Sequence, residues 1–462
     1  MKLSIKDKQV LVLGLGDTGL SALRWLKRQG ARLSVADTRQ VPPNLAQVQA
    51  EFPGITVSVG ALQAATFAGA DLVVISPGVP LAEPEVQAAI ARGITVVGDV
   101  ELFGQYRPAS SKLIAITGAN GKSTVTTLVG EMCKAAGLNT VVAGNIGLPV
   151  LEVLDDQQAQ VDVYVLELSS FQLETTRSLN ADAATVLNLS EDHMDRYSGM
   201  ADYAAAKAHV FAHAGGGGVQ VLNRDDAWSL GMTLPGRQLV HFGLGAPTQG
   251  SDFGLIQRDG ADWLAQGAET LLPLSALRIA GLHNAANALA ALALCRSLGL
   301  PWAPLLQALR DFAGLPHRVQ WLAELNGVSF YDDSKGTNVG ATCAALSGFP
   351  NKVVLIAGGD GKGQDFSPLR APVAANARAV VLIGRDAPHI AAVLQDTGVP
   401  LLPASDLPSA VHIASAAAQH GDAVLLSPAC ASFDMFRNYL HRAEVFADAV
   451  QALKSGGQES AA

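Results

Sequence analysis

TGANGKST, at residues 117–124, follows an apolar run at 113–117 and precedes a helical pattern at 125–136 that Gly137 terminates. The apolar run predicts a buried β-strand, and a glycine after a helical pattern is a typical helix stop. Glycines between a strand and a helix let backbone N–H groups converge on phosphate oxygens, where the helix dipole favours negative charge. The sequence therefore predicts an α/β domain with a nucleotide phosphate at this loop.

Lys122 and Ser123 give this loop its expected chemistry. Lys122 has the length to reach the β- and γ-phosphates, and the Ser123 hydroxyl is a ligand for Mg²⁺ in loops of this kind. The loop is shorter than the ordinary Walker loop, because a leading glycine five residues before Gly121 would fall at Ile116. A chance Gly-Lys-Ser turn at the end of a strand is the alternative interpretation.

Short apolar runs alternate with Ala-rich helical patterns on both sides of this loop, which is typical of βαβ units and parallel sheets. Strands are expected at 10–14, 32–36, 72–76, 95–98, 113–117, 163–168, 185–189, 327–331, 352–357, 379–383 and 423–427. A polar linker at 105–111 and the Pro-His-Arg segment at 316–318 predict three α/β domains, at 1–104, 112–315 and 316–455. The glycine run at 215–218 is expected to form a turn, and 454–462 a loose tail.

A second glycine loop, GLGDTG at 14–19, fits the GxGxxG pattern and follows the first expected strand. Asp37 ends the next strand, 18 residues beyond Gly19, where an acidic residue binds a sugar hydroxyl in dinucleotide-binding domains. The pattern leaves three interpretations open: NAD, another nucleotide, or close packing of the helix on the strand. It therefore predicts a phosphate at a helix N-terminus without identifying the nucleotide.

Two ionisable residues after the phosphate loop are candidates for a metal site. Glu167, in LELSSFQLE at 166–174, ends an apolar strand, where a carboxylate is costly to bury unless it meets a cation. His193, in NLSEDHMDRY at 188–197, follows the next strand, and together the two could supply oxygen and nitrogen ligands for Mg²⁺. The alternative for His193 is a locally bonded loop histidine. Lys207 follows in an Ala-rich helix, where an ordinary surface lysine is expected from the pattern taken in isolation.

Three polar loops follow strands in the last third of the chain. They are DDSKGTN at 332–338, GGDGKG at 358–363 and SPACASFD at 427–434. Each combines charged and small residues that suit phosphate, metal or a charged substrate, although each alone could be a turn. Because ligands in open α/β sheets bind at the carboxyl ends of the strands, the three loops predict a shared site.

These motifs resemble those of the Mur ligase family when they are taken in order: TGANGKST, LELSSFQLE, NLSEDHMDRY, GLHNAAN at 281–287, and DDSKGTN. The resemblance extends from Gly14 to Tyr439 and is greatest to the members that add D-glutamate. It implies a Rossmann-like N-terminal domain for a UDP-sugar, a central P-loop ATPase-like domain for ATP, and a Rossmann-like C-terminal domain. It also implies an ATP- and Mg²⁺-dependent ligase that joins the L-alanyl carboxylate of UDP-N-acetylmuramoyl-L-alanine to the amine of D-glutamate. The reaction would pass through an acyl phosphate, in peptidoglycan precursor synthesis.

The resemblance also implies which residues bind each substrate. Contacts to the UDP-substrate are expected at Asp17, Thr18, Asp37, Thr38, Arg39, Ser76, Pro77, Gly78, Asn145, Ser169 and His193. Contacts to ATP are expected at Gly118, Ala119, Asn120, Gly121, Lys122, Ser123, Thr124, Asn287, Arg318 and Asp333. Contacts to D-glutamate are expected at Lys335, Thr337, Lys362, Ser432, Phe433 and Tyr439. Mg²⁺ would be bound by Ser123, Glu167, His193 and Lys207, the last as a carbamate, and catalysis would depend on Lys122, Lys207, Lys335 and His193.

Two of these positions depart from the family pattern. Leucine is common where Asp17 stands, so the backbone of Asp17 is the expected contact. Tyr439 stands where the family often has phenylalanine, so its aromatic face is expected to serve and its hydroxyl is assigned no role. In this family the first glycine loop binds UDP, which favours UDP over NAD at 14–19.

The composition argues against several other classes of protein. The 462 residues are 49% apolar and 16% charged, and the net charge of −9 disfavours nucleic acid as a partner. The four cysteines form no CxxC pair, which favours reduced core residues over a disulfide or zinc framework. The N-terminus lacks a signal-peptide pattern and no apolar run approaches membrane-spanning length. A cytoplasmic monomer without membrane insertion is therefore expected.

Rival functions come from three classes. Another member of the family would add L-alanine, a diamino acid or, on folate, glutamate. The folate enzymes should lack the domain at 1–104, and the alanine-adding enzyme lacks the pairing of GGDGKG with SPACASFD. An NAD-dependent dehydrogenase would use the GxGxxG loop but leaves TGANGKST and DDSKGTN unexplained. A P-loop switch protein is the non-enzymatic alternative.

Overall fold

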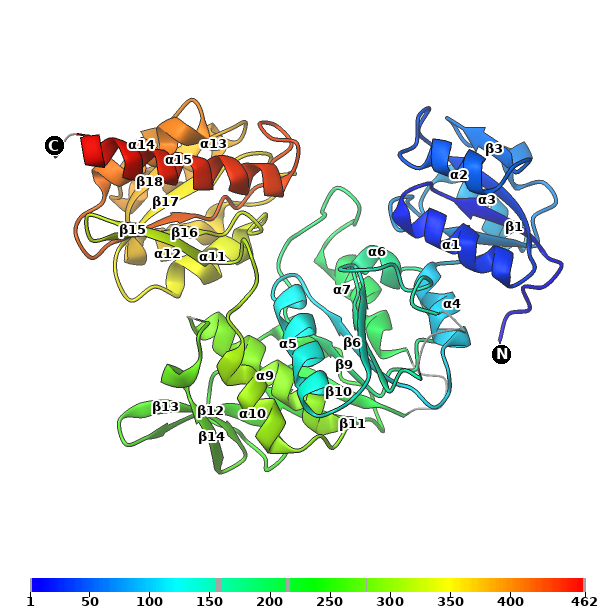
Figure 1. The fold of residues 1–462 in the computed structure, drawn as a ribbon, viewed down its shortest axis with the longest axis horizontal. Coiled ribbons are helices and arrows are strands. Elements are labelled where there is room, and N and C mark those ends of the chain that lie inside the picture. Colours follow the sequence, from blue (N-terminus) through cyan, green and yellow to red (C-terminus); the bar gives the residue numbers. More distant parts are fainter. Residues whose placement is uncertain (1, 155–159, 213–216, 280, 460–462) are drawn as a thin grey trace. The chain divides into compact units, whose positions relative to one another are not determined.

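The computed structural model describes residues 2–154, 160–212, 217–279 and 281–459 (Figure 1). The chain forms two compact units, and each is discontinuous in sequence. The first unit comprises Met1–Leu189, Ala201–Leu272 and Ala288–Leu309, and the second comprises Ser190–Met200, Pro273–Asn287 and Arg310–Ala462. Within the described residues, two β-sheets lie in the first unit and one in the second.

The first sheet is parallel, with the order β3-β2-β1-β4-β5 among the described residues. Its strands are β1 (Gln9–Leu13), β2 (Arg32–Asp37), β3 (Thr56–Val59), β4 (Leu72–Ile75) and β5 (Thr95–Val97). The helices between and after them are α1 (Asp17–Arg28), α2 (Leu45–Glu51), η1 (Ala64–Phe67), α3 (Pro84–Ala91) and α4 (Asp99–Tyr106). The strand order reverses on either side of β1, and ligands bind open α/β sheets at such a point, beyond the carboxyl ends of the strands.

The second sheet has the order β14-β13-β12-β11-β10-β9-β6-β8-β7 among the described residues. Its first six strands in sequence are β6 (Lys112–Thr117), β7 (Thr140–Gly144), β8 (Val163–Glu167), β9 (Ala183–Val186), β10 (Val219–Asn223) and β11 (Gln238–Phe242). They pair in parallel, and β6 lies between β8 and β9. The helices of this part are α5 (Lys122–Ala135), α6 (Ser170–Leu173), α7 (Met200–Ala208), η2 (His209–Phe211), α8 (Ala227–Gly231), α9 (Leu282–Ser297) and α10 (Trp302–Asp311).

Three further strands extend the second sheet and do not follow the βα alternation. They are β12 (Phe253–Arg258), β13 (Ala261–Gln266) and β14 (Glu269–Pro273), followed by η3 (Leu274–Ala276). β12 pairs in parallel with β11 at Phe242 and antiparallel with β13 over its whole length. Asp259 and Gly260 lie between β12 and β13 with positive φ angles, as a tight hairpin requires. The purely parallel pattern expected from the sequence is therefore incomplete here.

The third sheet, in the second unit, has the order β15-β16-β20-β17-β18-β19 among the described residues. Its strands are β15 (Gln320–Leu325), β16 (Val328–Asp332), β17 (Val353–Gly358), β18 (Ala377–Ile383), β19 (Leu401–Pro403) and β20 (Ala423–Leu426). All neighbours are parallel except β15, which pairs antiparallel with β16 at the edge. Its helices are α11 (Val339–Ser347), η4 (Ser367–Leu369), α12 (Arg370–Asn376), α13 (Ala387–Leu394), η5 (Gln395–Thr397), α14 (Leu407–Ala417) and α15 (Tyr439–Glu459).

The central strand β17 shows how this sheet is buried on both faces. Val353 and Leu355 pack into one cluster with residues of α11, α12 and α13, whereas Val354 and Ile356 pack into another with residues of α14 and α15. Successive side chains of a strand point to opposite faces, so a strand covered on both sides must be apolar throughout. This explains the unbroken apolar run at 353–357 and leaves the strand ends as the place for polar residues.

The α/β class with three domains is confirmed, whereas several boundaries shift. The phosphate-loop helix begins at Lys122 rather than at 125, and β9 ends at Val186, before the expected 189. The helix α15 continues to Glu459, so the tail expected from 454 is helical up to that residue, and 460–462 lie outside the described residues. In the turn expected at 215–218, Gly215 and Gly216 also lie outside them. The domain limits at 104, 112 and 315 stay a prediction.

Membrane insertion was not expected from the sequence. Among the residues that the structure describes, we find no helix with the length and apolar character needed to span a bilayer.

Candidate active site

The phosphate-loop candidate at 118–124 connects β6 to α5 in the first unit. Gly121, the residue before the helix, has a φ of +82°, a left-handed conformation that glycine adopts without a Cβ penalty. The side chain of Lys122 folds back over the loop, and its Nζ donates to the carbonyls of Gly118 (3.0 Å) and Ala119 (2.8 Å). The lysine charge and the N-terminus of α5 therefore lie at one place, as an anion site requires.

Asn188, which follows β9, holds this loop through three hydrogen bonds. Its carbonyl accepts from the Ala119 N–H (2.8 Å), its Oδ1 accepts from the Asn120 N–H (2.9 Å), and its Nδ2 donates to the Asn120 carbonyl (3.1 Å). Because β9 and β6 are neighbours, Asn188 and the loop meet at the carboxyl edge of the sheet. The sequence placed Asn188 in a notable run but did not indicate this contact.

Glu167 ends β8, the other neighbour of β6, and its carboxylate is almost completely buried. Its Oε1 accepts a hydrogen bond from Asn145 Nδ2 (2.7 Å), and the Asn145 N–H donates to the Glu167 carbonyl (2.8 Å). Its Oε2 is buried and has no hydrogen-bond partner in the described part of the chain. A buried carboxylate oxygen without a donor is costly, and a bound cation would remove that cost.

Lys207, on α7, is buried and not a surface residue, so the interpretation of its helix taken in isolation is wrong. Its Nζ donates to the Gly118 carbonyl (2.9 Å) and lies 3.3 Å from Thr117 Oγ1, at the end of β6. The same Nζ lies 4.7 Å from the centre of the Tyr203 ring. The helix therefore delivers a buried amine directly to the phosphate loop.

Three of the four expected metal ligands come from elements around the end of β6. Ser123 lies in the first turn of α5, Glu167 ends the adjacent β8, and Lys207 reaches the loop itself. His193 belongs to the second unit, where its Nε2 lies 3.6 Å from Asp192 Oδ2, and its role at the metal stays a prediction. Nowhere in the described ranges do three or more His, Cys, Asp or Glu side chains gather as metal ligands.

The N-terminal glycine loop at 14–19 is tightly packed at two of its three glycines. A Cβ on Gly19 would lie 1.9 Å from the Gly14 carbonyl oxygen, and one on Gly14 would lie 2.8 Å from Ser76 Cβ. A Cβ on Gly16 would meet nothing within 4 Å. The third glycine is therefore explained by close packing of α1 on the loop after β1, and the first by contact with Ser76, whereas Gly16 faces open space.

The carboxylate of Asp37, at the end of β2, accepts hydrogen bonds from nearby residues of the same domain. Oδ2 accepts from the Leu15 N–H (2.7 Å) and from Arg39 Nη2 (2.7 Å), while Oδ1 accepts from the Arg39 N–H (2.8 Å) and Nε (2.9 Å). Burial acts to raise the pKa of Asp37, but the hydrogen bonds from Arg39 and Leu15 outweigh it and lower the pKa. The carboxylate thus fixes the loop and presents Arg39, which is exposed, at the sheet edge.

The other UDP-substrate candidates lie beyond strand ends of the two sheets in the first unit. Ser76 directly follows β4 and donates its Oγ to the Gly14 carbonyl (3.2 Å), and exposed Asp17 accepts from Asn44 Nδ2 (3.1 Å). Ser169 follows β8 and caps α6, with its N–H donating to Gln172 Oε1 (3.0 Å). The remaining candidates in the first unit, whose roles stay predictions, are Thr18, Thr38, Pro77 and Gly78.

In the second unit, Asp333 follows β16 and is buried. Its Oδ2 accepts from Ser427 Oγ (2.7 Å), and its Oδ1 accepts from the Val319 N–H (3.3 Å). Burial raises the pKa of Asp333 to about 7, with a smaller contribution from Asp332, although Ser427 and Arg318 act in the opposite direction. Burial therefore works against the charged form of this carboxyl group.

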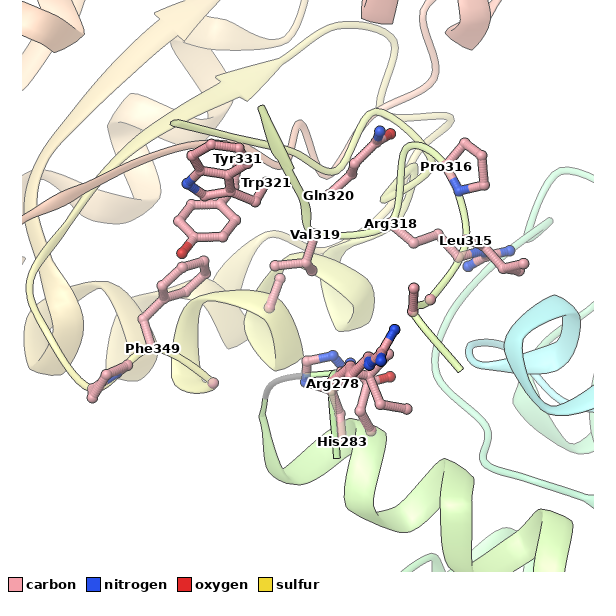
Figure 2. A pocket seen from close by; sticks show the side chains of 17 residues that line it. Arg278, His283, Leu315, Pro316, Arg318, Val319, Gln320, Trp321, Tyr331 and Phe349 are labelled. Carbon is pink, nitrogen blue, oxygen red and sulfur yellow. The ribbon is translucent and has the colours of Figure 1, made fainter. Parts of the chain in front are cut away.

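A cavity of about 690 Å³ is lined in part by Val319, whose N–H donates to Asp333, and all its lining residues belong to the second unit. Figure 2 shows the rings of Trp321, Tyr331 and Phe349 at one end and the side chains of Arg318 and His283 nearer the other. Burial lowers the pKa of His283, which favours a neutral ring. The expected ATP contact Arg318 thus lines a cavity with a wall of aromatic rings that the sequence did not indicate. Asn287 donates its Nδ2 to Asn284 (3.2 Å), which lines the same cavity.

The D-glutamate candidates lie in loops beyond the carboxyl ends of the third sheet, except Tyr439, which begins α15. Lys335 Nζ lies 3.9 Å from the centre of the Tyr439 ring, a cation–π contact that joins two of the expected residues. Lys362 has a φ of +52°, and its Nζ lies 3.5 Å from Asp192 Oδ1. The ring of Phe433 is 74% exposed. The remaining candidates on these loops are half-buried Thr337 and buried Ser432.

Three family models match consecutive parts of the chain. They are the Mur ligase MurD-like N-terminal domain at 8–98, the Mur ligase middle domain at 116–295 and the Mur ligase glutamate ligase domain at 317–430. A UDP-N-acetylmuramoylalanine--D-glutamate ligase from Methylobacillus flagellatus is 68% identical, over 98% of this chain and 98% of its own. The protein of the same name from Thiobacillus denitrificans is 58% identical, over 98% of each chain. The chain belongs to the Mur ligase family.

Two solved Mur ligase structures share the fold at low sequence identity. UDP-N-acetylmuramate-alanine ligase MurC from Thermotoga maritima has a TM-score of 0.58 and 20% identity, and the match covers 96% of this chain and 99% of that one. MurF from Acinetobacter baumannii has a TM-score of 0.61 and 16% identity, with 97% and 93% covered. At these identities the likeness supports the three-domain α/β fold alone.

The family resemblance expected from the motifs is thus confirmed for this Mur ligase, while the assignment of its individual site residues stays a prediction. The structure brings Lys122, Lys207 and Glu167 to one sheet edge, and it joins Lys335 to Tyr439. It adds two kinds of residue that the motifs did not indicate. One is polar residues that fasten loops, such as Asn188, and the other is the aromatic wall of the cavity.

Proposed function

We propose that this Mur ligase joins UDP-N-acetylmuramoyl-L-alanine to D-glutamate at the expense of ATP, in peptidoglycan precursor synthesis. The observation that carries the proposal is the 68% identity, over nearly the full length of both chains, to a relative named for that reaction. The site chemistry agrees with it, because a cationic loop at a helix N-terminus stands beside a buried, underpaired carboxylate. That combination suits a nucleotide and a metal.

Two chemical steps complete the proposed reaction. The L-alanyl carboxylate attacks the γ-phosphorus of ATP, the bond to the β-γ bridging oxygen breaks, and an acyl phosphate and ADP result. The amine of D-glutamate then attacks the acyl carbon, loses a proton and displaces inorganic phosphate, which leaves the amide. Phosphoryl transfer needs mainly positioning and charge neutralisation, so Lys122 and Lys335 would bind the transferring phosphate. Protein nucleophiles are not required.

Mg²⁺ fits the residues at the end of β6. When bound, it would neutralise charge on the β- and γ-phosphates, and Ser123, Glu167, His193 and carbamylated Lys207 would hold it. The support for this set is the unpartnered Oε2 of Glu167, a hard anionic oxygen of the kind that Mg²⁺ prefers.

The surroundings of Lys207 support the proposed carbamylation. Its amine is buried beside the Gly118 carbonyl, in the same loop that already contains the charge of Lys122. A second ammonium there would add positive charge at a metal site. A carbamate, formed when the neutral amine adds to CO₂ and releases a proton, supplies anionic oxygens and keeps one N–H for the carbonyl.

The N-terminal sheet is the proposed site for the UDP moiety, with Asp17, Thr18, Asp37, Thr38, Arg39 and Ser76–Gly78, and with Asn145 and Ser169 toward the sugar. The alternative, NAD, would need the carboxylate of Asp37 for ribose hydroxyls, but Arg39 and Leu15 already occupy it. Exposed Arg39 offers a cation instead. This geometry favours a nucleoside diphosphate bound through its phosphates.

The remaining residues proposed to contact substrates belong to the second unit. ATP would contact Asn287, Arg318 and Asp333 besides the loop at 118–124. D-glutamate would contact Lys335, Thr337, Lys362, Ser432, Phe433 and Tyr439. Its two carboxylates suit the lysines in this set. We also expect the enzyme to be cytoplasmic, because ATP and nucleotide sugars are cytoplasmic metabolites. We expect it to be a monomer.

The test is release of inorganic phosphate by the purified chain with ATP, Mg²⁺, UDP-N-acetylmuramoyl-L-alanine and one amino acid at a time. Turnover should require D-glutamate, with L-glutamate a poor replacement. L-Alanine and a diamino acid are the controls for the rival Mur ligase functions. Equal turnover with either would contradict the proposal, and so would ATP hydrolysis that needs no amino acid.

A further inference from the structure

Arg442 lies in the first turn of α15 and is completely buried, which is rare for an arginine. Its two terminal nitrogens donate to backbone carbonyls: Nη1 to Cys430 (3.1 Å) and Nη2 to Ser334 (2.9 Å). Its Nε has no hydrogen-bond partner in the described part of the chain. A buried cation whose hydrogen-bond acceptors are neutral carbonyls is costly, so a role that repays the cost is expected.

The two carbonyls belong to different site loops. Ser334 directly precedes Lys335 in the loop after β16, and Cys430 lies two residues before Ser432 in the loop after β20. β16 and β20 are neighbours in the sheet, so both loops leave the same edge. A planar guanidinium holds two acceptors at a fixed separation, which a flexible ammonium cannot do.

The first turn of α15 also contacts the side chain of Lys335, through the ring of Tyr439. Tyr439 stands three residues before Arg442 on α15, and residues with this spacing share a face of a helix. The Tyr439 ring lies under Lys335 Nζ at 3.9 Å. The first turn of α15 therefore contacts the loop at 332–338 twice, through the Ser334 backbone and the Lys335 side chain.

Nearby acidic groups also affect the charge of the Arg442 guanidinium. The carboxylates of Asp434, Asp332 and Asp333 favour the protonated guanidinium, although burial lowers the pKa of Arg442 to about 10. Arg442 thus remains charged at neutral pH, and its terminal nitrogens donate to the two loops.

We propose that Arg442 is a positioning residue for D-glutamate: it sets the separation between the loop that carries Lys335 and the loop that carries Ser432. The inference rests on the proposed function, since it assigns both loops to that substrate. Arg442 itself is buried and does not touch substrate. Its loss should loosen the D-glutamate site and leave the UDP-substrate site, on other sheets, unchanged.

The experiment compares Arg442→Met, which keeps the length and removes the charge, with Arg442→Lys, which keeps the charge but cannot hold two carbonyls rigidly. Arg370→Met, at an exposed position of α12 in the same unit, is the matched control. The KM for D-glutamate should rise at least about tenfold in Arg442→Met and by a smaller factor in Arg442→Lys. The KM for UDP-N-acetylmuramoyl-L-alanine should stay within about twofold in both, and the control should match the wild type.

Two results would overturn the inference. One is a folded Arg442→Met enzyme with an unchanged KM for D-glutamate; if that variant does not fold, the same result with folded Arg442→Lys is decisive. The other is an equal rise in the KM values for D-glutamate and the UDP-substrate, which indicates general loosening. A wild-type enzyme without D-glutamate dependence would remove the proposed function as well, so the two failures are distinguishable.

Discussion

The two glycine loops of the first unit share a strand–loop–helix setting but differ in the charges around them. At 14–19 the buried carboxylate of Asp37 is already paired with Arg39 and the Leu15 amide. At 118–124 the loop holds the amine of Lys122, and Glu167 at the adjacent strand end retains an unpartnered buried oxygen. Glycine spacing therefore indicates the shape of a loop, whereas the pairing of neighbouring charges indicates its chemistry.

The largest effect should come from removing the cation of the second loop. We expect Lys122→Ala to lower kcat/KM for ATP by about 10³-fold, because charge neutralisation at the transferring phosphate is lost. Lys112→Ala is the matched control: it stands at the opposite end of β6 and is 59% exposed. UDP-substrate affinity, measured by calorimetry, should be unchanged in both.

A decrease of less than about tenfold for Lys122→Ala would show that the loop binds no phosphate in the transition state. The proposed difference between the loops at 14–19 and 118–124 would then be wrong, since neither loop would take part in catalysis.

The second prediction concerns Lys207 and the metal side of the same loop. Lys207→Ala should lower turnover by about 100-fold while the protein remains folded and still binds the UDP-substrate. Acetate or formate should restore part of the activity, because a small carboxylate can occupy the position of the carbamate oxygens. Lys134→Ala, an exposed lysine on α5, is the control.

A readout independent of activity decides between a carbamate and a bare amine. Wild-type enzyme equilibrated with ¹³C-bicarbonate should show a carbamate carbon signal that Lys207→Ala lacks. Near-normal turnover of Lys207→Ala, or an active wild type without that signal, would refute the modification.

The sequence predicted contacts between residues that are close along the chain better than contacts between residues that are far apart along it. Strand ends, glycine loops and the order of motifs are local, and they predicted the α/β class and the loops at 117–124 and 332–338. Asn188 contacts the phosphate loop across 68 positions, and Arg442 contacts Ser334 across 108, and such contacts leave no local pattern. Residues that fasten loops were therefore missed.

Lys207 was misjudged in isolation for a related reason. Its helix is rich in alanine, which is compatible with both buried and exposed faces, so the pattern around 200–208 indicates no buried side. Only the packing of α7 against the end of β6 shows that the amine is buried. The strands β12–β14 were missed because they break the βα alternation on which the other strands were expected.

The third prediction separates the packing glycines of the first loop from the glycine that faces open space. Gly19→Ala should lower the free energy of unfolding by about 2 kcal/mol, because its Cβ would meet the Gly14 carbonyl at 1.9 Å. Gly16→Ala should change stability by less than about 0.5 kcal/mol, since nothing lies within 4 Å of its Cβ. It should instead weaken UDP binding about tenfold if the phosphates approach this backbone.

Calorimetric titration with UDP and thermal unfolding of the two variants give both quantities. Equal UDP affinity in wild type and Gly16→Ala would place the phosphates elsewhere, and tighter binding of NAD than of UDP by the wild type would revive the dinucleotide interpretation.

The smallest effect should come from replacing the carboxylate of Asp37, which is hydrogen-bonded to the first glycine loop. Asp37→Asn loses the ionic part of the hydrogen bonds to Arg39 and Leu15, so it should destabilise the N-terminal domain by about 1–2 kcal/mol at pH 7. The pKa of Asp37 is lowered in the folded protein, so its carboxylate stabilises the fold above the ordinary aspartate pKa of about 3.9. That contribution is lost as the pH falls through the lower, folded pKa. The difference in thermal unfolding midpoint between wild type and Asp37→Asn should therefore be constant from pH 7 to about 5 and shrink below about pH 4. A difference that grows with acidity would mean that the pair with Arg39 does not stabilise this loop, and Asp37 would again be available for a ribose.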